Sequence, residues 1–329
     1  MKFVLEFNPY KMNNQKVLVT GGTGFLGIHA VLQLLEKGYS VNTTLRSLTK
    51  KETVIKALKE GGITDFSKLS FFEAELTNDN GWDEAVKDCD YVLHIASPFP
   101  AKEPKDENEL IVPARDGALR VLQAAKKAKV KRVVLTSSFA AVGYSINSDN
   151  HVFTEDDWTA VNIALPAYIK SKTVAEKAAW DFIENEGEGL ELSVINPVGI
   201  FGPALGGITS ASLDIAIIGI LNGTTSQSGD FTMGVVDVRD VADLHIKAMT
   251  NPKAAGERFL ANAGDVMSFY DVAKLIMEER PSISGNIAEM SPTGNKFYKQ
   301  MSNQKAITIL DWEPRSREEA ILASVDSLQ

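Results

Sequence analysis

A tyrosine and a lysine four residues apart offer the clearest chemistry in this sequence. Tyr168 and Lys172 form the pattern Y-x-x-x-K at the start of a helical run that extends to position 183. Residues at i and i+4 share one face of a helix, so the two side chains are expected to meet. A neighbouring ammonium lowers the pKa of a phenol toward neutrality, where proton transfer is efficient. The pair predicts an acid–base site, but such a pattern also occurs in ordinary helices.

Serines that follow a predicted strand accompany this pair. Ser137 and Ser138 come directly after the β-branched run 132–136, and Ser138 precedes Tyr168 by 30 residues. A serine at the carboxyl end of a sheet can donate a hydrogen bond to a carbonyl oxygen beside the phenol. Serines after strands also cap turns and helices, so either serine taken singly fits both roles. The order of serine, tyrosine and lysine favours a catalytic group.

A glycine-rich turn lies between the first predicted strand and the first predicted helix. Gly21, Gly24 and Gly27 form G-x-x-G-x-x-G, in which the glycines permit a sharp turn, close approach of a pyrophosphate and tight helix packing. The helix that follows offers free N–H groups and a positive dipole to phosphates. The predicted cofactor-binding segment therefore comprises the three glycines and three residues between them: Thr23, Phe25 and Leu26. The alternative is a glycine-rich turn without a ligand.

The charge after the second predicted strand distinguishes between the two nicotinamide cofactors. NAD-binding proteins usually place an acid about 20 residues beyond the glycines, to accept from the ribose 2′-hydroxyl. Here Arg46 occupies that region, and Lys50 and Lys51 follow closely. A guanidinium can pair with a 2′-phosphate, which a carboxylate would repel. We therefore predict NADP(H), the alternative being that Arg46 only begins a solvated basic turn.

Two further strand ends are candidates for the cofactor wall. Glu75 and Leu76 follow the third predicted strand, where the carboxylate could accept from an adenine amino group or be an ordinary exposed acid. Ala96 and Ser97 follow the fourth predicted strand, and their small side chains leave room near the topological switch point.

The elements that position these residues alternate regularly between strand and helix. Predicted strands cover residues 16–20, 40–45, 69–74, 91–95, 132–136, 191–195 and 258–261, and predicted helices cover 26–37, 52–59, 110–129 and 168–183. This alternation predicts an α/β fold with a Rossmann-type, doubly wound parallel sheet. The expected division is an N-terminal extension (1–15), a dinucleotide domain (16–196 with 234–262) and a smaller, discontinuous substrate lobe (197–233 with 263–329).

Composition excludes several classes of protein. The 329 residues carry 34 basic and 43 acidic side chains, a net charge of −9, which disfavours nucleic-acid or anionic-membrane partners. No apolar run approaches the length of a membrane span. The single cysteine, Cys89, fits a reducing, cytoplasmic location, and four histidines leave little material for a metal site. The expected partner is a small molecule, and the expected assembly is a monomer or a homodimer.

Together these motifs resemble the extended short-chain dehydrogenase/reductases, in the branch of dihydroflavonol-4-reductase-like and methylglyoxal-reductase-like carbonyl reductases. The likeness covers TGGTGFLG at 20–27, HIASP at 94–98, LTSSFAAVG at 135–143, YIKSKTVAEKAAWDF at 168–182, NPVGIFGP at 196–203, VVDVRDVADLHIKAM at 235–249 and GERF at 256–259. The sequence departs from the family in two places. An aromatic, cysteine-containing signature of cinnamoyl-CoA reductases is replaced by 164–167, and the usual aspartate after the third strand is Glu75.

The resemblance implies roles for particular residues. It assigns catalysis to Ser138, Tyr168 and Lys172, and the 2′-phosphate contact to Arg46. It also implies that the segment from Pro197 to Ile200 backs the nicotinamide, and that Asp240 buttresses the sheet without reacting.

The expected reaction is reduction of an aldehyde or ketone by NADPH, with a proton from Tyr168. One alternative is an NAD-dependent nucleotide-sugar epimerase or dehydratase, which Arg46 disfavours. Another is a non-catalytic NADP sensor, a class that often loses the tyrosine or the lysine. Candidates for an apolar substrate wall are the 205–213 loop and four aromatic residues, for which lobe packing is the alternative role: Phe99, Phe139, Tyr144 and Phe201.

Overall fold

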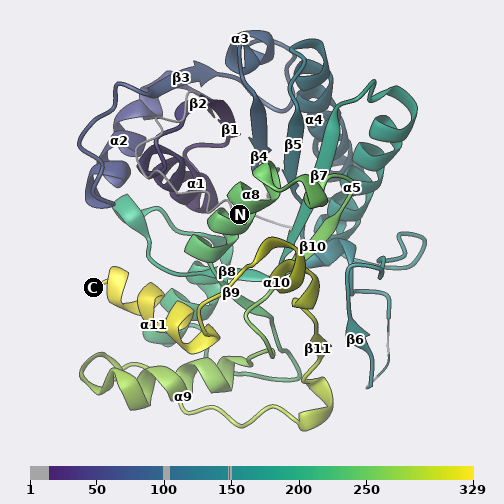
Figure 1. Ribbon diagram of the computed structural model, residues 1–329. Coiled ribbons are helices and arrows are strands. Elements are labelled where there is room, and N and C mark those ends of the chain that lie inside the picture. Colours follow the sequence, from purple (N-terminus) through teal and green to yellow (C-terminus); the bar gives the residue numbers. More distant parts are fainter. Residues whose placement is uncertain (1–14, 99–103, 147, 149) are drawn as a thin grey trace, which may run out of the picture.

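A central sheet of seven parallel strands organises the structure, a computed structural model that describes residues 15–98, 104–146, 148 and 150–329 (Figure 1). The predicted extension, apart from residue 15, and Phe99 lie outside the described residues. The strand order is β10-β7-β5-β4-β1-β2-β3. The bounds are β1 Lys16–Thr20, β2 Ser40–Leu45, β3 Leu69–Glu73, β4 Tyr91–His94, β5 Arg132–Thr136, β7 Glu191–Pro197 and β10 Arg258–Ala261. The order reverses between β1 and β4, so the predicted doubly wound sheet is confirmed.

Helices cover both faces of this sheet because its strands carry apolar side chains on both sides. Val17 and Val19 of β1 belong to one core with α1 (Phe25–Glu36), α2 (Lys51–Glu60) and α8 (Val238–Thr250). Leu18 belongs to a second core with α3 (Trp82–Val86), α4 (Asn108–Lys127) and α5 (Ala167–Glu186). Successive side chains of β1 therefore face opposite cores, so the sheet is the middle layer between two layers of helices.

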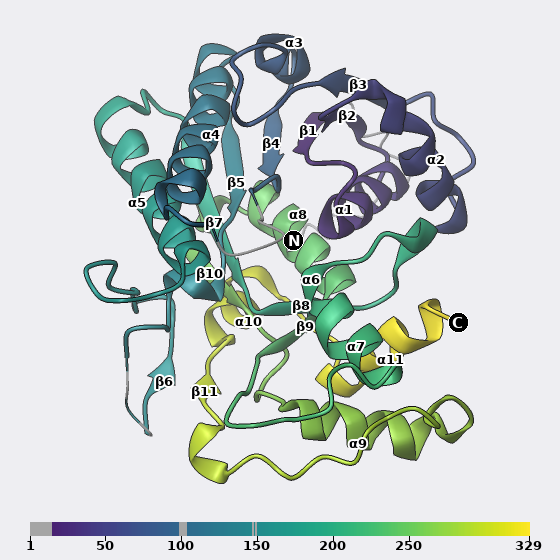
Figure 2. The same ribbon diagram turned by 180° about the vertical axis from the view of Figure 1, so that it is seen from behind.

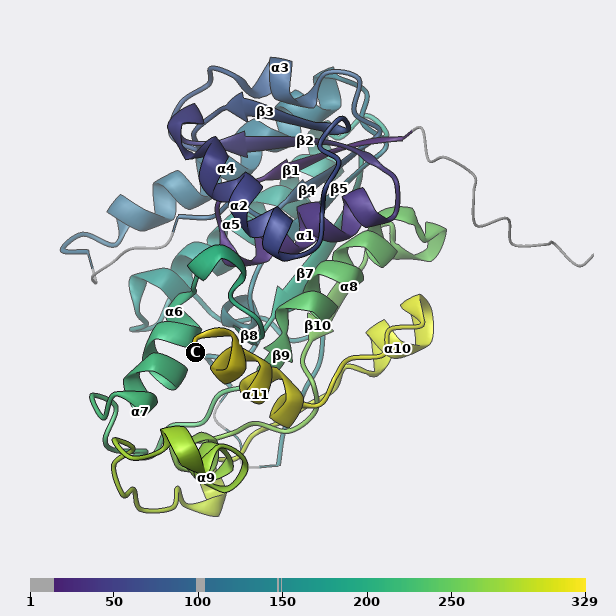
Figure 3. The ribbon, with the colours of Figure 1, turned by 90° about the vertical axis from the view of Figure 1, so that its left-hand side faces the viewer.

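The C-terminal lobe is assembled from segments far apart in the chain (Figures 2 and 3). Two small parallel sheets join β8 (Gly199–Phe201) to β9 (Val235–Asp237) and β6 (Val152–Phe153) to β11 (Gln300–Met301). Its helices are α6 (Ala211–Leu213), α7 (Gly219–Leu221), α9 (Phe269–Glu279), α10 (Gln304–Leu310) and α11 (Arg317–Ser327), with a π-helical turn at Asp214–Ile218. Our predicted division places residues 234–262 in the dinucleotide domain. Within this range β9 pairs with β8, whereas α8 packs in the same core as α1 and α2, and the division stays a prediction.

Short 3-10 turns connect many of these elements. They lie at Leu48–Lys50, Phe139–Ala141, Leu205–Gly207, Pro252–Ala254, Pro281–Ile283 and Asn295–Phe297. Within the described part of the chain, no helix is both long enough and apolar enough to cross a membrane.

Candidate active site

The glycine turn after β1 lies against the segment after β4, at the switch point of the sheet. Gly21 has a φ of +76°, and a Cβ added there would lie 3.1 Å from the Cα of Ala96. The Ala96 N–H donates to the Thr20 hydroxyl at 3.0 Å, and that hydroxyl also bonds to the His94 ring at 2.9 Å. The structure thus brings two predicted cofactor segments together in a cradle that only small residues can form.

The N-terminus of α1 is open to an anion. Gly27 packs so closely that an added Cβ would lie 2.2 Å from the Gly21 carbonyl oxygen. Gly24 caps the helix without a side-chain hydrogen bond, and no acid lies in the first turn. The side chains of Phe25 and Leu26 are buried in the core, so only their backbone groups are available to a ligand. Thr23, within the turn, is half-buried. These residues fit a dinucleotide pyrophosphate.

Basic residues lie just beyond the end of β2. Arg46 follows the strand directly, and Arg46 and Lys50 are both exposed. The Lys51 ammonium lies 5.3 Å from the centre of the Phe71 ring. On the neighbouring strand, the Glu73 carboxylate accepts from the Leu48 N–H at 3.1 Å. Positive side chains therefore remain available where a 2′-phosphate is expected.

The remaining candidates for adenine contact lie after β3. Because β3 ends at Glu73, the predicted residues Glu75 and Leu76 fall in the loop that follows. Glu75 is exposed, and the Leu76 carbonyl accepts from the Arg120 guanidinium at 2.6 Å.

Ser138, Tyr168 and Lys172 meet at the carboxyl end of β5. Ser138 caps the 3-10 turn at Phe139–Ala141, and its side chain is hydrogen-bonded to Tyr168, in the first turn of α5. The Lys172 ammonium lies 6.0 Å from the centre of the Tyr168 ring. The neighbouring Ser137 hydroxyl instead donates to Glu176 at 2.5 Å. The geometry thereby distinguishes the two serines that the sequence left open and favours Ser138.

Burial dominates the electrostatics of this group. It raises the pKa of Tyr168 above its ordinary value, while the hydrogen bond to Ser138 acts in the opposite direction. Burial also lowers the pKa of Lys172 to about 8, against the charge of Glu176. Our expectation of a tyrosine pKa lowered toward neutrality is therefore wrong, because the net shift is upward. The free-energy cost of removing the phenolate from water exceeds the stabilisation that its hydrogen bond to Ser138 provides.

A small cavity lies between Lys172 and the segment after β4. Its volume is about 20 Å³, and its walls include the predicted residues Ala96, Ser97 and Lys172. Glu176 also lines it, although our sequence analysis did not select this residue. The signal was present, since Glu176 follows Lys172 by one helical turn on the same face.

The candidates for the substrate wall occupy different surroundings. The rings of Phe139 and Tyr144 lie 5.9 Å apart, and Tyr144 acts electrostatically on Tyr168. Phe201 is completely buried in the core, which favours its alternative role in lobe packing. Within the 205–213 loop, Gly206 packs against Ala57 of α2, away from the tyrosines.

The segment expected to back the nicotinamide leaves the sheet at the end of β7. Pro197 is buried as the last residue of that strand, and Ile200 is half-buried in β8. Asp240 on α8, which was expected to support the sheet, pairs with the Arg315 side chain and accepts from the Arg315 backbone N–H at 2.7 Å.

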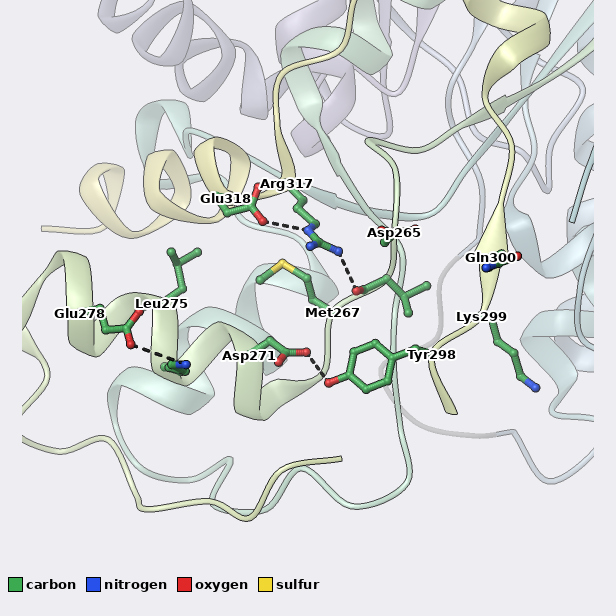
Figure 4. A pocket seen from close by; sticks show the side chains of 12 residues that line it. Asp265, Met267, Asp271, Leu275, Glu278, Tyr298, Lys299, Gln300, Arg317 and Glu318 are labelled. Atoms are coloured by element: carbon green, nitrogen blue, oxygen red, sulfur yellow. Dashed lines mark hydrogen bonds and ion pairs between the residues drawn. The ribbon is translucent and has the colours of Figure 1, made fainter. Parts of the chain in front are cut away.

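A larger pocket of about 500 Å³ lies in the C-terminal lobe (Figure 4). Asp271 on α9 accepts from the Tyr298 hydroxyl at 2.6 Å, and Arg317 donates to the Val266 carbonyl at 3.0 Å. None of the predicted site residues that the structure describes lines this pocket. The described residues also contain no cluster of three His, Cys, Asp or Glu side chains suited to a metal.

A doubly wound sheet with a glycine turn at its switch point defines a dinucleotide-binding protein. The chain belongs to the NAD dependent epimerase/dehydratase family, whose model matches residues 17–264. It is 34% identical to a cinnamoyl-CoA reductase of Medicago truncatula (95% of each chain covered) and 33% identical to a protein of Candida albicans named as an NADPH-dependent methylglyoxal reductase (90% and 93%).

A solved structure of yeast methylglyoxal/isovaleraldehyde reductase complexed with NADPH superposes with a TM-score of 0.82. Its sequence identity is 28%, and the match covers 95% of this chain and 98% of that one. The predicted resemblance to the extended reductases is confirmed.

Proposed function

We propose that this protein is an NADPH-dependent reductase of aldehydes and ketones, in which Tyr168 donates the proton. The observation that carries the proposal is the group formed by Ser138, Tyr168 and Lys172 near the segment after β4, which packs on the glycine turn. Relatives named as NADPH-dependent reductases, and a similar structure that contains NADPH, support the oxidoreductase class and the cofactor.

Bound NADPH supplies the hydride. The backbone around Gly21 and Gly24 and the first turn of α1 would hold its pyrophosphate, and Arg46 would pair with its 2′-phosphate. Pro197 and Ile200 are proposed to back the nicotinamide. Lys172 is proposed to donate hydrogen bonds to the ribose hydroxyls from its position on α5.

The chain's own residues manage the proton and the developing charge. Because burial raises its pKa, Tyr168 carries its proton at neutral pH and can donate it to the carbonyl oxygen of the substrate. Ser138 donates a hydrogen bond to the same oxygen and stabilises charge as it forms. The Lys172 ammonium stabilises the phenolate that remains on Tyr168.

The two alternatives have less support. An epimerase or dehydratase that retains NAD is disfavoured by Arg46 and by the absence of an acid from Arg46 to Lys51. A sensor without catalysis does not require the hydrogen-bonded serine and tyrosine that this chain retains.

For the substrate, Phe139 and Tyr144 favour a hydrophobic or aryl carbonyl compound over a phosphorylated one. A screen of aldehydes, ketones and 1,2-dicarbonyls with NADPH and with NADH would define the substrate class. The cytoplasmic location and the monomeric or homodimeric assembly stay predictions.

The decisive experiment replaces Tyr168 with Phe, which removes the acid and keeps the ring. The turnover number should fall by about 10²–10⁴-fold, while NADPH should bind with unchanged affinity. Tyr298→Phe is a matched control, because it removes a phenolic hydroxyl from the C-terminal lobe and should leave turnover near the wild-type rate. Near-normal reduction by Tyr168→Phe would refute the proposed mechanism.

A further inference from the structure

Glu176 is a buried carboxylate with donors from several elements. It lies one helical turn after Lys172 on α5, and its side chain has no exposed surface. One carboxylate oxygen accepts from Arg258 Nε at 2.6 Å and from Trp180 Nε1 at 3.4 Å. The other accepts from the Ser137 hydroxyl at 2.5 Å and from Asn196 Nδ2 at 2.7 Å. A buried charge survives only with pairing of this kind.

Two of these donors adjoin residues of the proposed site. Ser137 directly precedes Ser138 at the end of β5, and Asn196 directly precedes Pro197 in β7. The Asn196 amide also donates to the Ser138 carbonyl oxygen at 3.2 Å. Glu176 therefore ties together the ends of two neighbouring strands at the point where the catalytic serine leaves the sheet.

The same carboxylate provides negative charge beside Lys172. The charged or titratable groups described around this ammonium are Tyr168 and Glu176 on α5 and His94 on β4. Arg258 on β10 pairs in turn with Glu176. Burial, reinforced by the Lys172 charge, lowers the pKa of His94 to about 3, so the imidazole is neutral. Glu176 opposes the loss of the proton from Lys172.

We propose that Glu176 is a positioning residue of this site, which aligns Ser138 through Ser137 and Asn196 and holds Lys172 as an ammonium. The proposal rests on the proposed reductase function. Because its side chain has no exposed surface, Glu176 would act through these neighbours and not by contact with substrate or cofactor. Its charge acts through Lys172, whose ammonium stabilises the phenolate left on Tyr168.

The test removes the charge and keeps the shape, with Glu176→Gln. The pH at which kcat/KM falls on the alkaline side should decrease by about one unit, because Lys172 loses its proton more easily without the charge of Glu176. The titration of Lys172 itself, followed by the NMR shift of a carbon-13-labelled lysine Cε and assigned with Lys172→Met, should move down by the same amount. Trp180→Phe is the matched control, because it removes one donor, keeps the carboxylate and should shift neither curve.

A second variant separates the loss of the Glu176 charge from misfolding caused by an unpaired Arg258. Replacing Glu176 and Arg258 together with Met removes both charges, a change that buried ion pairs often tolerate, and both curves should shift in the same directions. A lower rate with both curves unshifted, in every folded variant, would overturn the proposal and leave Glu176 a purely structural role. If the wild type reduces no carbonyl compound, the proposed function fails, whereas the titration of Lys172 still decides the role of Glu176.

Discussion

Tyr168 and Lys172 occupy a site in which burial favours the neutral form of both groups. Reduction needs a protonated tyrosine and a charged lysine, and a raised pKa for Tyr168 with a pKa of about 8 for Lys172 provides both at neutral pH. The i, i+4 spacing revealed from sequence that the two side chains meet, but burial depends on the whole fold. The residues were therefore predictable, whereas the sign of the tyrosine shift was not.

Arg46 is the residue proposed to bind the 2′-phosphate of the cofactor. Arg46→Glu should weaken NADPH binding by roughly 10–100-fold, because it removes a charge-assisted pair and repels the 2′-phosphate. NADH should bind as well as before or better, since the new carboxylate can accept from a 2′-hydroxyl. Kd values for both cofactors, measured by fluorescence titration, would check this. Lys56→Glu makes the same charge change at an exposed position on α2 and should alter neither value.

Regular elements followed from local sequence, and irregular ones did not. Four strands have the predicted bounds, β1, β2, β5 and β10, because each is a short buried run that ends at a clear boundary. Helix α5 was predicted, although it extends to Glu186, past the expected end at 183. By contrast, β6 and β11 contain two residues each and pair across about half of the chain. Such strands are defined by their partners and leave no periodic signal.

Helix α1 packs against the glycine turn at Gly27, where there is no room for a side chain. Gly27→Ala would place a methyl group 2.2 Å from the Gly21 carbonyl oxygen, so α1 must move away from the turn. We expect a loss of about 1–3 kcal/mol in unfolding free energy, and at least about tenfold weaker NADPH binding. Urea unfolding and cofactor titration would measure the two effects. Gly285→Ala, where an added Cβ meets nothing within 4 Å, should change neither.

At the scale of the whole molecule, polar contacts join α8 to the segment that follows α10. The indole of Trp312, only 1% exposed, donates to the Asp240 carbonyl on α8 at 2.9 Å, and Arg315 pairs with the Asp240 side chain. The resemblance implied a supporting role for Asp240, but its partners lie some 70 residues away. Only the folded chain shows that this support comes from the segment after α10.

A second buried contact, between α8 and the sheet, makes stability depend on pH. His245 is fully buried, with its ring bonded to the Thr136 hydroxyl and the Val241 carbonyl, both at 2.7 Å. Burial lowers its pKa to about 4, against the bond to Val241. Below pH 6.5 the unfolded chain binds a proton at this histidine that the folded chain refuses until about pH 4. Stability is therefore lost as pH falls through that window, by up to about 1.4 kcal/mol per unit.

His245→Gln isolates this contribution, because glutamine does not titrate. The variant should be less stable than the wild type at pH 7, and the difference should shrink by about 1.4 kcal/mol per pH unit between pH 6 and pH 4.5. Urea unfolding at a series of pH values gives both curves. Thr136→Val removes the hydrogen bond but keeps the histidine, so its difference from the wild type should stay nearly constant. A constant difference for His245→Gln would show that His245 binds its proton equally in the folded and unfolded chains, contrary to its burial.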